Sequence, residues 1–180
     1  MKSVLISIQP KWCELIARGE KTVEVRKTRP KLETPFKCYI YCTYGAIKKM
    51  PKDYLKEHLE EGKVIGEFVC DEIMDARDMG GDEFYKKSCL TYNDWRKYTD
   101  GTKNTIWLWH ISDLVIYDKP RELGEFYQYC GDNPKCDGCE AHYYSNTECG
   151  LEDYCCSIVE GCKPLKRPFQ SWGYVYETDT

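Results

Sequence analysis

A chain of 180 residues and 21.2 kDa fits one domain with at most an appendage, and its 42% hydrophobic and 14% aromatic residues exclude wholesale disorder. No apolar run approaches the roughly 20 residues that a membrane span needs, and the apolar stretch at the N-terminus is too short for a signal peptide, so we expect a cytoplasmic protein with no membrane partner. The net charge of −4 argues against a nucleic-acid partner only if the charges are evenly spread.

The N-terminal segment predicts a strand followed by a short helix. Residues 3–8 form the expected strand, and Pro10 suits the first turn of a helix that runs to Arg18. Gly19 stands where such a helix ends. The apolar face expected for this helix consists of Trp12, Leu15 and Ile16.

Residues 21–27 follow as a strand with a period of two. One face of this strand carries Val23 and Val25. The other face carries Thr22, Glu24 and Arg26, so that an acid and a base stand side by side.

The rest of the chain predicts short strands and few helices. Further strands are expected at 36–43 (half-buried), 63–70, 105–111, 113–117 and 171–176, and a helix is expected at 53–61. Another helix begins with a capping box of Thr91 and Asp94, where Leu90 and Trp95 are placed as a hydrophobic staple. This pattern favours a closed or nearly closed barrel over a doubly wound sheet.

The charges are unevenly distributed along the chain. Residues 1–52 contain 12 Lys/Arg and 4 Asp/Glu, whereas residues 53–180 contain 14 and 26. The first part is therefore strongly basic, which indicates either an anion-binding surface or attraction between the two parts of the molecule.

The segment Gly19–Arg26, GEKTVEVR, resembles the G-x-K-x-x-E-x-R signature of ASCH domains, which belong to the PUA-like superfamily of RNA-binding β-barrels. Residues Ser7–Lys11 and Arg167–Val175 reinforce the resemblance. Together these segments are similar to ASCH proteins of phages and prophages. The likeness covers residues 1–125 and 163–177.

The resemblance implies an α+β fold, a PUA-like mixed β-barrel with short covering helices. Residues 1–129 with 163–180 would form the barrel, and 130–162 would form a cysteine-rich insertion. The resemblance also implies binding of RNA or a nucleotide-like small molecule in a cationic cleft. The residues expected to contact the ligand are Lys21, Thr22, Glu24, Arg26, Lys27, Arg29 and Trp172.

The residue types in this cleft suit such a ligand. Arg26 offers a planar fork of donors, Lys21 a movable point charge, and Glu24 an acceptor or a general base. A structural ion pair of Glu24 with Arg26 or Lys21 is the alternative. Trp172 is the aromatic residue expected to stack on a base, although aromatic residues are more often part of the core.

Some proteins with the ASCH barrel are enzymes, and the sequence leaves this open. Acetylcytidine amidohydrolases use a lysine, a threonine and a glutamate. Lys21 matches their lysine, but Glu24 fills the threonine position. Other members cleave RNA, for which Lys21 and Glu24 could supply an acid–base pair. Of the three histidines, His58, His110 and His142, His110 lies on an expected strand, where a structural role is the default.

The twelve cysteines fall into two groups. Five are scattered among apolar residues, where a cysteine usually acts as a small core residue: Cys13, Cys38, Cys42, Cys70 and Cys89. Seven crowd into 130–162, where Cys136 and Cys139 have the spacing of a structural zinc site. We expect zinc bound by Cys136, Cys139, Cys156 and Cys162. Disulfides, free thiols with a redox role, and an adaptor module that recruits a protein partner are the alternatives.

Overall fold

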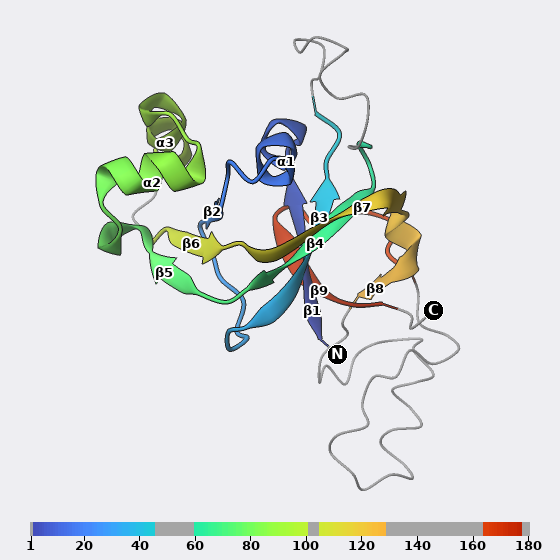
Figure 1. Ribbon diagram of the computed structural model, residues 1–180. Helices are drawn as coiled ribbons and strands as arrows, with labels where there is room; N and C mark the ends of the chain where they lie inside the picture. The colour runs from blue at the N-terminus through green and yellow to red at the C-terminus, as the bar shows by residue number, and fades with distance from the viewer. Residues whose placement is uncertain (1, 46–59, 101–104, 129–163, 178–180) are drawn as a thin grey trace, which may run out of the picture.

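The described part of the protein consists of two β-sheets and three short α-helices, shown in Figure 1. The computed structural model describes residues 2–45, 60–100, 105–128 and 164–177. None of the helices in these ranges is long and apolar enough to cross a membrane. The expected helix at 53–61 and the cysteine-rich insertion lie outside the described residues.

The larger sheet has six strands in the order β7-β4-β3-β1-β9-β8. Its strands are β1 (Ser3–Ile8), β3 (Phe36–Cys42), β4 (Val64–Cys70), β7 (Ser112–Arg121), β8 (Phe126–Gln128) and β9 (Trp172–Glu177). Only β1 and β3 are parallel, because α1 (Pro10–Ala17) and β2 (Val23–Arg26) lie between them in the chain. The sheet is therefore mixed and differs from the parallel sheet of doubly wound folds.

The smaller sheet has three antiparallel strands in the order β2-β6-β5, with β5 at Ile73–Asp75 and β6 at Trp107–His110. The chain passes from the larger sheet into the smaller one between β4 and β5, and it returns at Ile111 between β6 and β7. Two connections of at most two residues thus join the sheets, and Trp109 of β6 packs in the core formed by β1, β3 and β4.

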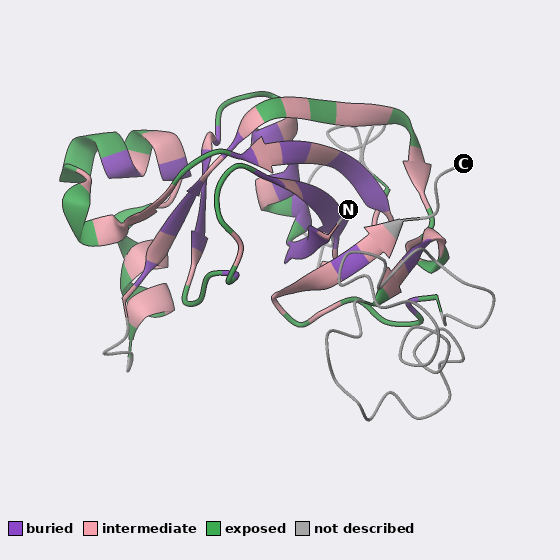
Figure 2. Cartoon of the chain, turned by 90° about the horizontal axis from the view of Figure 1, so that it is seen from below, coloured by how far each residue is buried: buried purple, intermediate pink, exposed green. Residues whose placement is uncertain are grey.

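The larger sheet is buried on both faces, and Figure 2 shows the buried residues concentrated in its central strands. One face carries the main core, in which Cys13 and Ile16 of α1 pack on the sheet. The other face carries a second core that includes Tyr39 and Tyr41. The expectation of a half-buried strand at 36–43 is therefore wrong. Each fully buried large side chain of these cores contributes about 1.5–3 kcal/mol of transfer free energy.

Helices α2 (Gly81–Ser88) and α3 (Tyr92–Thr99) pack on the smaller sheet and share a third core with Val23, Val25 and Leu108. The capping box predicted at the start of α3 is present, because Thr91 and Asp94 exchange hydrogen bonds between side chain and backbone. The short 3-10 helices are Ala76–Asp78 and Leu123–Glu125. The α+β fold with a mixed sheet and short covering helices that the sequence predicts is confirmed.

Candidate nucleotide-binding site

A tight turn after α1 places Lys21 at the start of β2. The helix ends where Gly19 adopts a φ of +72°, a backbone conformation that glycine reaches without steric cost. The backbone N–H groups of Glu20 and Lys21 both donate to Leu15 O, at 2.9 and 3.0 Å. These bonds hold the Lys21 side chain beside the strand that carries Glu24 and Arg26.

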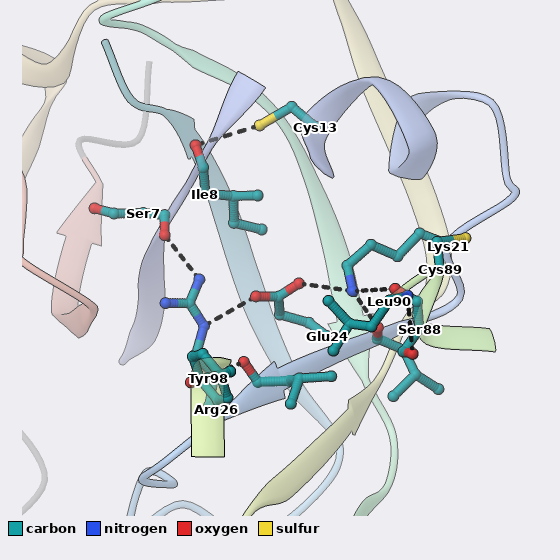
Figure 3. A network of polar contacts seen from close by, with 12 residues as sticks. Ser7, Ile8, Cys13, Lys21, Glu24, Arg26, Ser88, Cys89, Leu90 and Tyr98 are labelled. Carbon is teal, nitrogen blue, oxygen red and sulfur yellow. Dashed lines mark hydrogen bonds and ion pairs between the residues drawn. The ribbon is translucent and has the colours of Figure 1, made fainter. Parts of the chain in front are cut away.

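Lys21 is only 2% exposed, and its ammonium group is held from several sides (Figure 3). Nζ donates to Val23 O at 2.7 Å and to Ser88 O at 2.9 Å, and it lies 3.3 Å from Glu24 Oε2. Since an ammonium group has three N–H donors, these contacts occupy all of them. Lys21 is thus a fixed charge, and the expectation of a movable one is wrong.

Arg26 lies on the other side of Glu24 and connects β2 to both ends of the described chain. One terminal nitrogen donates to Ser7 O at 2.7 Å, and the other donates to Ser171 Oγ at 3.2 Å. Arg26 Nε lies 3.1 Å from Glu24 Oε1, but its N–H is not aligned for a hydrogen bond. Two terminal N–H groups of the guanidinium remain without a partner in the described residues.

The Glu24 carboxylate is therefore held between two cations, with its side chain 8% exposed. A carboxylate can accept about four hydrogen bonds, and the contacts to Lys21 and Arg26 occupy at most two of these positions. Trp109, opposite Glu24 in the register of β2 and β6, is fully buried. The side-by-side arrangement of Glu24 and Arg26 predicted from the strand pattern is confirmed.

These three side chains line a cavity of about 310 Å³. The other lining residues come from β1, β2, α1, the last turn of α3, and the segments that follow β1 and β3 or precede α3 and β9: Ser7, Ile8, Gln9, Trp12, Val25, Thr43, Leu90, Tyr98 and Gln170. The cavity thus has three charged side chains, two aromatic rings and several amide or hydroxyl groups. Its volume is at the lower end of the range of about 300–1,000 Å³ for small-molecule sites.

Tyr98 is fixed by a hydrogen bond of 3.3 Å from its hydroxyl group to Val25 O. Burial raises the pKa of the Tyr98 phenol above its ordinary value of 10.0, a shift that Arg26 opposes and Glu24 supports. The phenol is therefore a neutral group near pH 7. Together with Trp12, it gives the cavity aromatic surface on the sides of α3 and α1.

The other residues expected to bind ligand lie outside the cavity lining. Thr22 uses its backbone to bond Lys87 and Ile111. Lys27 and Arg29 are exposed and lie over the rings of Tyr98 and Trp107. The segment that follows β2 therefore meets the cavity at Lys27 and continues past Trp107.

Trp172 packs on the core and does not line the cavity. Its ring lies edge-on to Trp109 at 5.8 Å between centroids, and its Nε1 donates to Thr28 Oγ1 at 3.0 Å. The aromatic residues at the cavity are instead Trp12 and Tyr98, which the sequence reading did not select. The apolar spacing of the first helix included Trp12, but the buried residues of α1 are Pro10, Cys13 and Ile16.

The scattered cysteines are core residues, as expected, with one exception. Cys13, Cys38, Cys42 and Cys70 are fully buried, whereas Cys89 is half-buried at the end of α2. Burial raises the pKa of the Cys13 thiol well above its ordinary value, and the neighbouring Cys42 raises it further. Burial likewise raises the pKa of Cys70 to about 12. Such thiols are poor nucleophiles at neutral pH.

His110 has the structural role expected for it, because its Nδ1 lies 2.7 Å from Asp71 Oδ1. This hydrogen bond lowers the pKa of Asp71. In the ranges that the structure describes, no group of three or more His, Cys, Asp or Glu side chains could hold a metal ion. The expected zinc ligands Cys136, Cys139, Cys156 and Cys162 lie outside those ranges.

Comparison with known proteins places this arrangement in a family. The model of the ASCH domain matches residues 6–114, which include Lys21, Glu24 and Arg26. A crystal structure of ASCH from Zymomonas mobilis is 22% identical, with a TM-score of 0.52 over 67% of this chain and 73% of that chain.

Two mutants of the Zymomonas protein give the same result. A tyrosine-to-phenylalanine mutant is 22% identical, with a TM-score of 0.52 over 68% of this chain and 77% of that chain. A serine-to-alanine mutant is 22% identical, with a TM-score of 0.51 over 67% and 74%. At this identity the likeness shows a common fold. No curated protein matches the chain.

Proposed function

The chain belongs to the ASCH domain family, and from that premise we propose that its cavity binds an unpaired nucleobase, presented by RNA or by a nucleotide-like small molecule. The observation that carries the proposal is the Glu24 carboxylate, which is held between two cations in a cavity with aromatic walls. A base has a flat apolar face and a polar edge, and the cavity offers a partner for each.

The hydrogen-bonding groups of the cavity favour a base edge over a phosphate. Lys21 has no free donor, because two carbonyl oxygens and Glu24 occupy its ammonium group. A phosphate would bring a second anion close to Glu24, which would cost electrostatic free energy. Glu24 can instead accept from an exocyclic amino group, while the remaining N–H groups of Arg26 donate to a carbonyl oxygen or ring nitrogen.

The aromatic side chains support the same proposal. Unstacked bases are commonly held against aromatic side chains, and each such contact is worth about 1–3 kcal/mol. Trp12 and Tyr98 line the cavity from different elements, α1 and α3. A base in the cavity can therefore contact aromatic surface while its polar edge faces Glu24.

Calorimetric titration with the four nucleoside 5′-monophosphates tests the proposal. We expect the monophosphates of adenine, cytosine and guanine to bind more tightly than that of uracil, because only the first three carry an exocyclic amino group. Glu24→Gln should remove this preference, at a cost of about tenfold or more in affinity, since a hydrogen bond to a charged group contributes about 1.5–3 kcal/mol.

Two further variants make the outcome decisive. Glu67→Gln is the matched control, because Glu67 is also a partly buried carboxylate with a lysine and a tyrosine partner but lies outside the cavity. Trp12→Leu keeps an apolar side chain and should weaken all four ligands alike. If no monophosphate or short RNA binds, or if Glu24→Gln and Trp12→Leu bind like the wild type, the cavity is not the site.

A hydrolase acting on a modified nucleoside or on RNA is the second candidate. The contact of 3.3 Å between Lys21 Nζ and Glu24 Oε2 supports it, because a buried carboxylate beside a lysine is also suited to general acid–base chemistry. This reading expects Glu24→Gln to abolish turnover of an acylated cytidine or of RNA while substrate still binds. Binding without turnover by the wild type would favour the first candidate.

A further inference from the structure

The segment 27–31, which follows β2 at the edge of the cavity, has three cations in five residues. Lys27, Arg29 and Lys31 are exposed, and none of them forms an ion pair within the described parts of the chain. An unpaired cluster of this kind usually binds anions or is simply solvated. The surroundings of the segment decide between these possibilities.

The segment lies along a row of half-buried aromatic rings from α3, β6 and β9. Lys27 Nζ is 5.1 Å from the ring centre of Tyr98, and the Arg29 guanidinium is 4.3 Å from that of Trp107. The backbone N–H of Lys31 donates to the Tyr174 hydroxyl group at 2.7 Å.

These contacts fix the positions of the Lys27 and Arg29 cations without neutralising them, whereas Lys31 is held through its backbone. A guanidinium stacked on a ring keeps its N–H edges free for a phosphate, and a ring does not cancel the charge as a carboxylate would. The row therefore has the combination of cations and aromatic rings found in sites for single-stranded nucleic acid.

The row is also continuous with the cavity. Tyr98 lines the cavity and carries Lys27 on its ring. Arg26 in the cavity and Lys27 on the outside are adjacent residues of the same chain segment. A strand with one base in the cavity would thus have its backbone beside residues 27–31.

We propose that residues 27–31 bind the sugar–phosphate backbone of a single RNA strand whose unpaired base occupies the cavity, so that the ligand is an RNA strand and not a free nucleotide. This inference rests on the proposed function of the cavity. It separates two roles: Glu24 and its neighbours select a base, and the cations on the rings supply affinity that does not depend on sequence.

The test compares a labelled single-stranded RNA of about eight nucleotides, within the usual site size, with adenosine 5′-monophosphate. The variant Lys27→Gln/Arg29→Gln/Lys31→Gln should bind the RNA at least tenfold more weakly. The slope of log affinity against log salt should fall by about 2, because each phosphate contact to a single strand contributes about 0.7. Affinity for the monophosphate, which brings one phosphate instead of a chain of them, should fall by no more than about threefold.

The control variant is Lys86→Gln/Lys97→Gln/Lys119→Gln, which removes the same charge from exposed positions elsewhere. It should bind the RNA within about threefold of the wild type. An RNA duplex of the same sequence should bind more weakly than the single strand, because its bases are paired.

Three results would overturn the inference and leave the proposed function standing. The first is a triple variant of residues 27–31 with unchanged RNA affinity and salt slope, and the second is an equal loss of RNA affinity in both triple variants. The third is a triple variant of residues 27–31 that loses as much affinity for a polyglutamate peptide as for RNA. Failure of the wild type to bind either nucleotide or RNA would instead remove the proposed function itself.

Discussion

The buried ammonium group of Lys21 makes a strong prediction about stability. Lys21→Met keeps the apolar stem and its burial but removes the charge, the hydrogen bonds to Val23 O and Ser88 O, and the ion pair with Glu24. Removing one partner of a buried ion pair costs about 3–5 kcal/mol. Because Arg26 still lies 3.1 Å from Glu24 and keeps its carboxylate paired, we expect the lower part of this range, about 3–4 kcal/mol.

Urea denaturation followed by circular dichroism measures this loss. With a slope of about 2 kcal/mol/M, typical of a small protein, the midpoint should fall by about 1.5–2 M. Lys87→Met is the matched control, since Lys87 pairs with Glu83 at 2.7 Å with its side chain 40% exposed. Such a pair contributes about 0.3–0.5 kcal/mol.

The result that would refute this reasoning is a similar loss in both variants. If Lys21→Met lowered the free energy of unfolding by less than about 1 kcal/mol, the value of an exposed pair, the ammonium group could not be held by two carbonyl oxygens and a carboxylate. If the slope of unfolding free energy against urea concentration also fell, the unfolded ensemble would have changed. The loss of stability would then have to be measured by hydrogen exchange at Val23 and Ser88.

Two other predictions concern acid stability and metal content. Hydrogen bonds from the Thr91 side chain and backbone lower the pKa of Asp94 below its ordinary value of 3.8, so its contribution is present above that pH and is lost as the pH falls through the folded-state pKa. The difference in urea midpoint between wild type and Asp94→Asn should therefore shrink on acidification, and a constant difference would contradict the linkage. The cysteine-rich insertion at 130–162 is predicted to bind about one zinc per chain; less than half an equivalent in protein purified without chelator, measured by atomic emission, would reject this prediction.

Local patterns in the sequence predicted the elements that carry the site. The alternation around Glu24 and Arg26 placed both side chains on one face of β2, and the capping box at Thr91 located the start of α3. Both signals are local, since they depend on neighbours two or three residues apart. The sequence reading missed α2, because its buried face consists of little more than Phe84 and Ser88.

Features that depend on tertiary contacts could not be predicted from the sequence. Tyr39 alternates with apolar residues, a pattern that predicts a half-buried strand, yet its ring lies in the second core. Trp172 belongs to the segment that resembles the family, but its ring packs on Trp109. Trp12 and Tyr98 are 86 positions apart in the sequence, yet both line the cavity. Their spacing has no period, so only the folded arrangement of α1 and α3 brings them together.

The contacts of Arg26 couple the cavity to residues that are made much later in synthesis. Its guanidinium bridges Ser7 O in β1 and Ser171 Oγ before β9, a residue 145 positions later. Ser7 also donates through Oγ to Phe169 O and through its backbone N–H to Ser171 O. During synthesis, residues 7–26 leave the ribosome long before 169–171, and long-range contacts of this kind form late. A nascent chain with β1 and β2 alone would lack this wall of the site, so ligand binding would require residues 169–171 to have been made and folded.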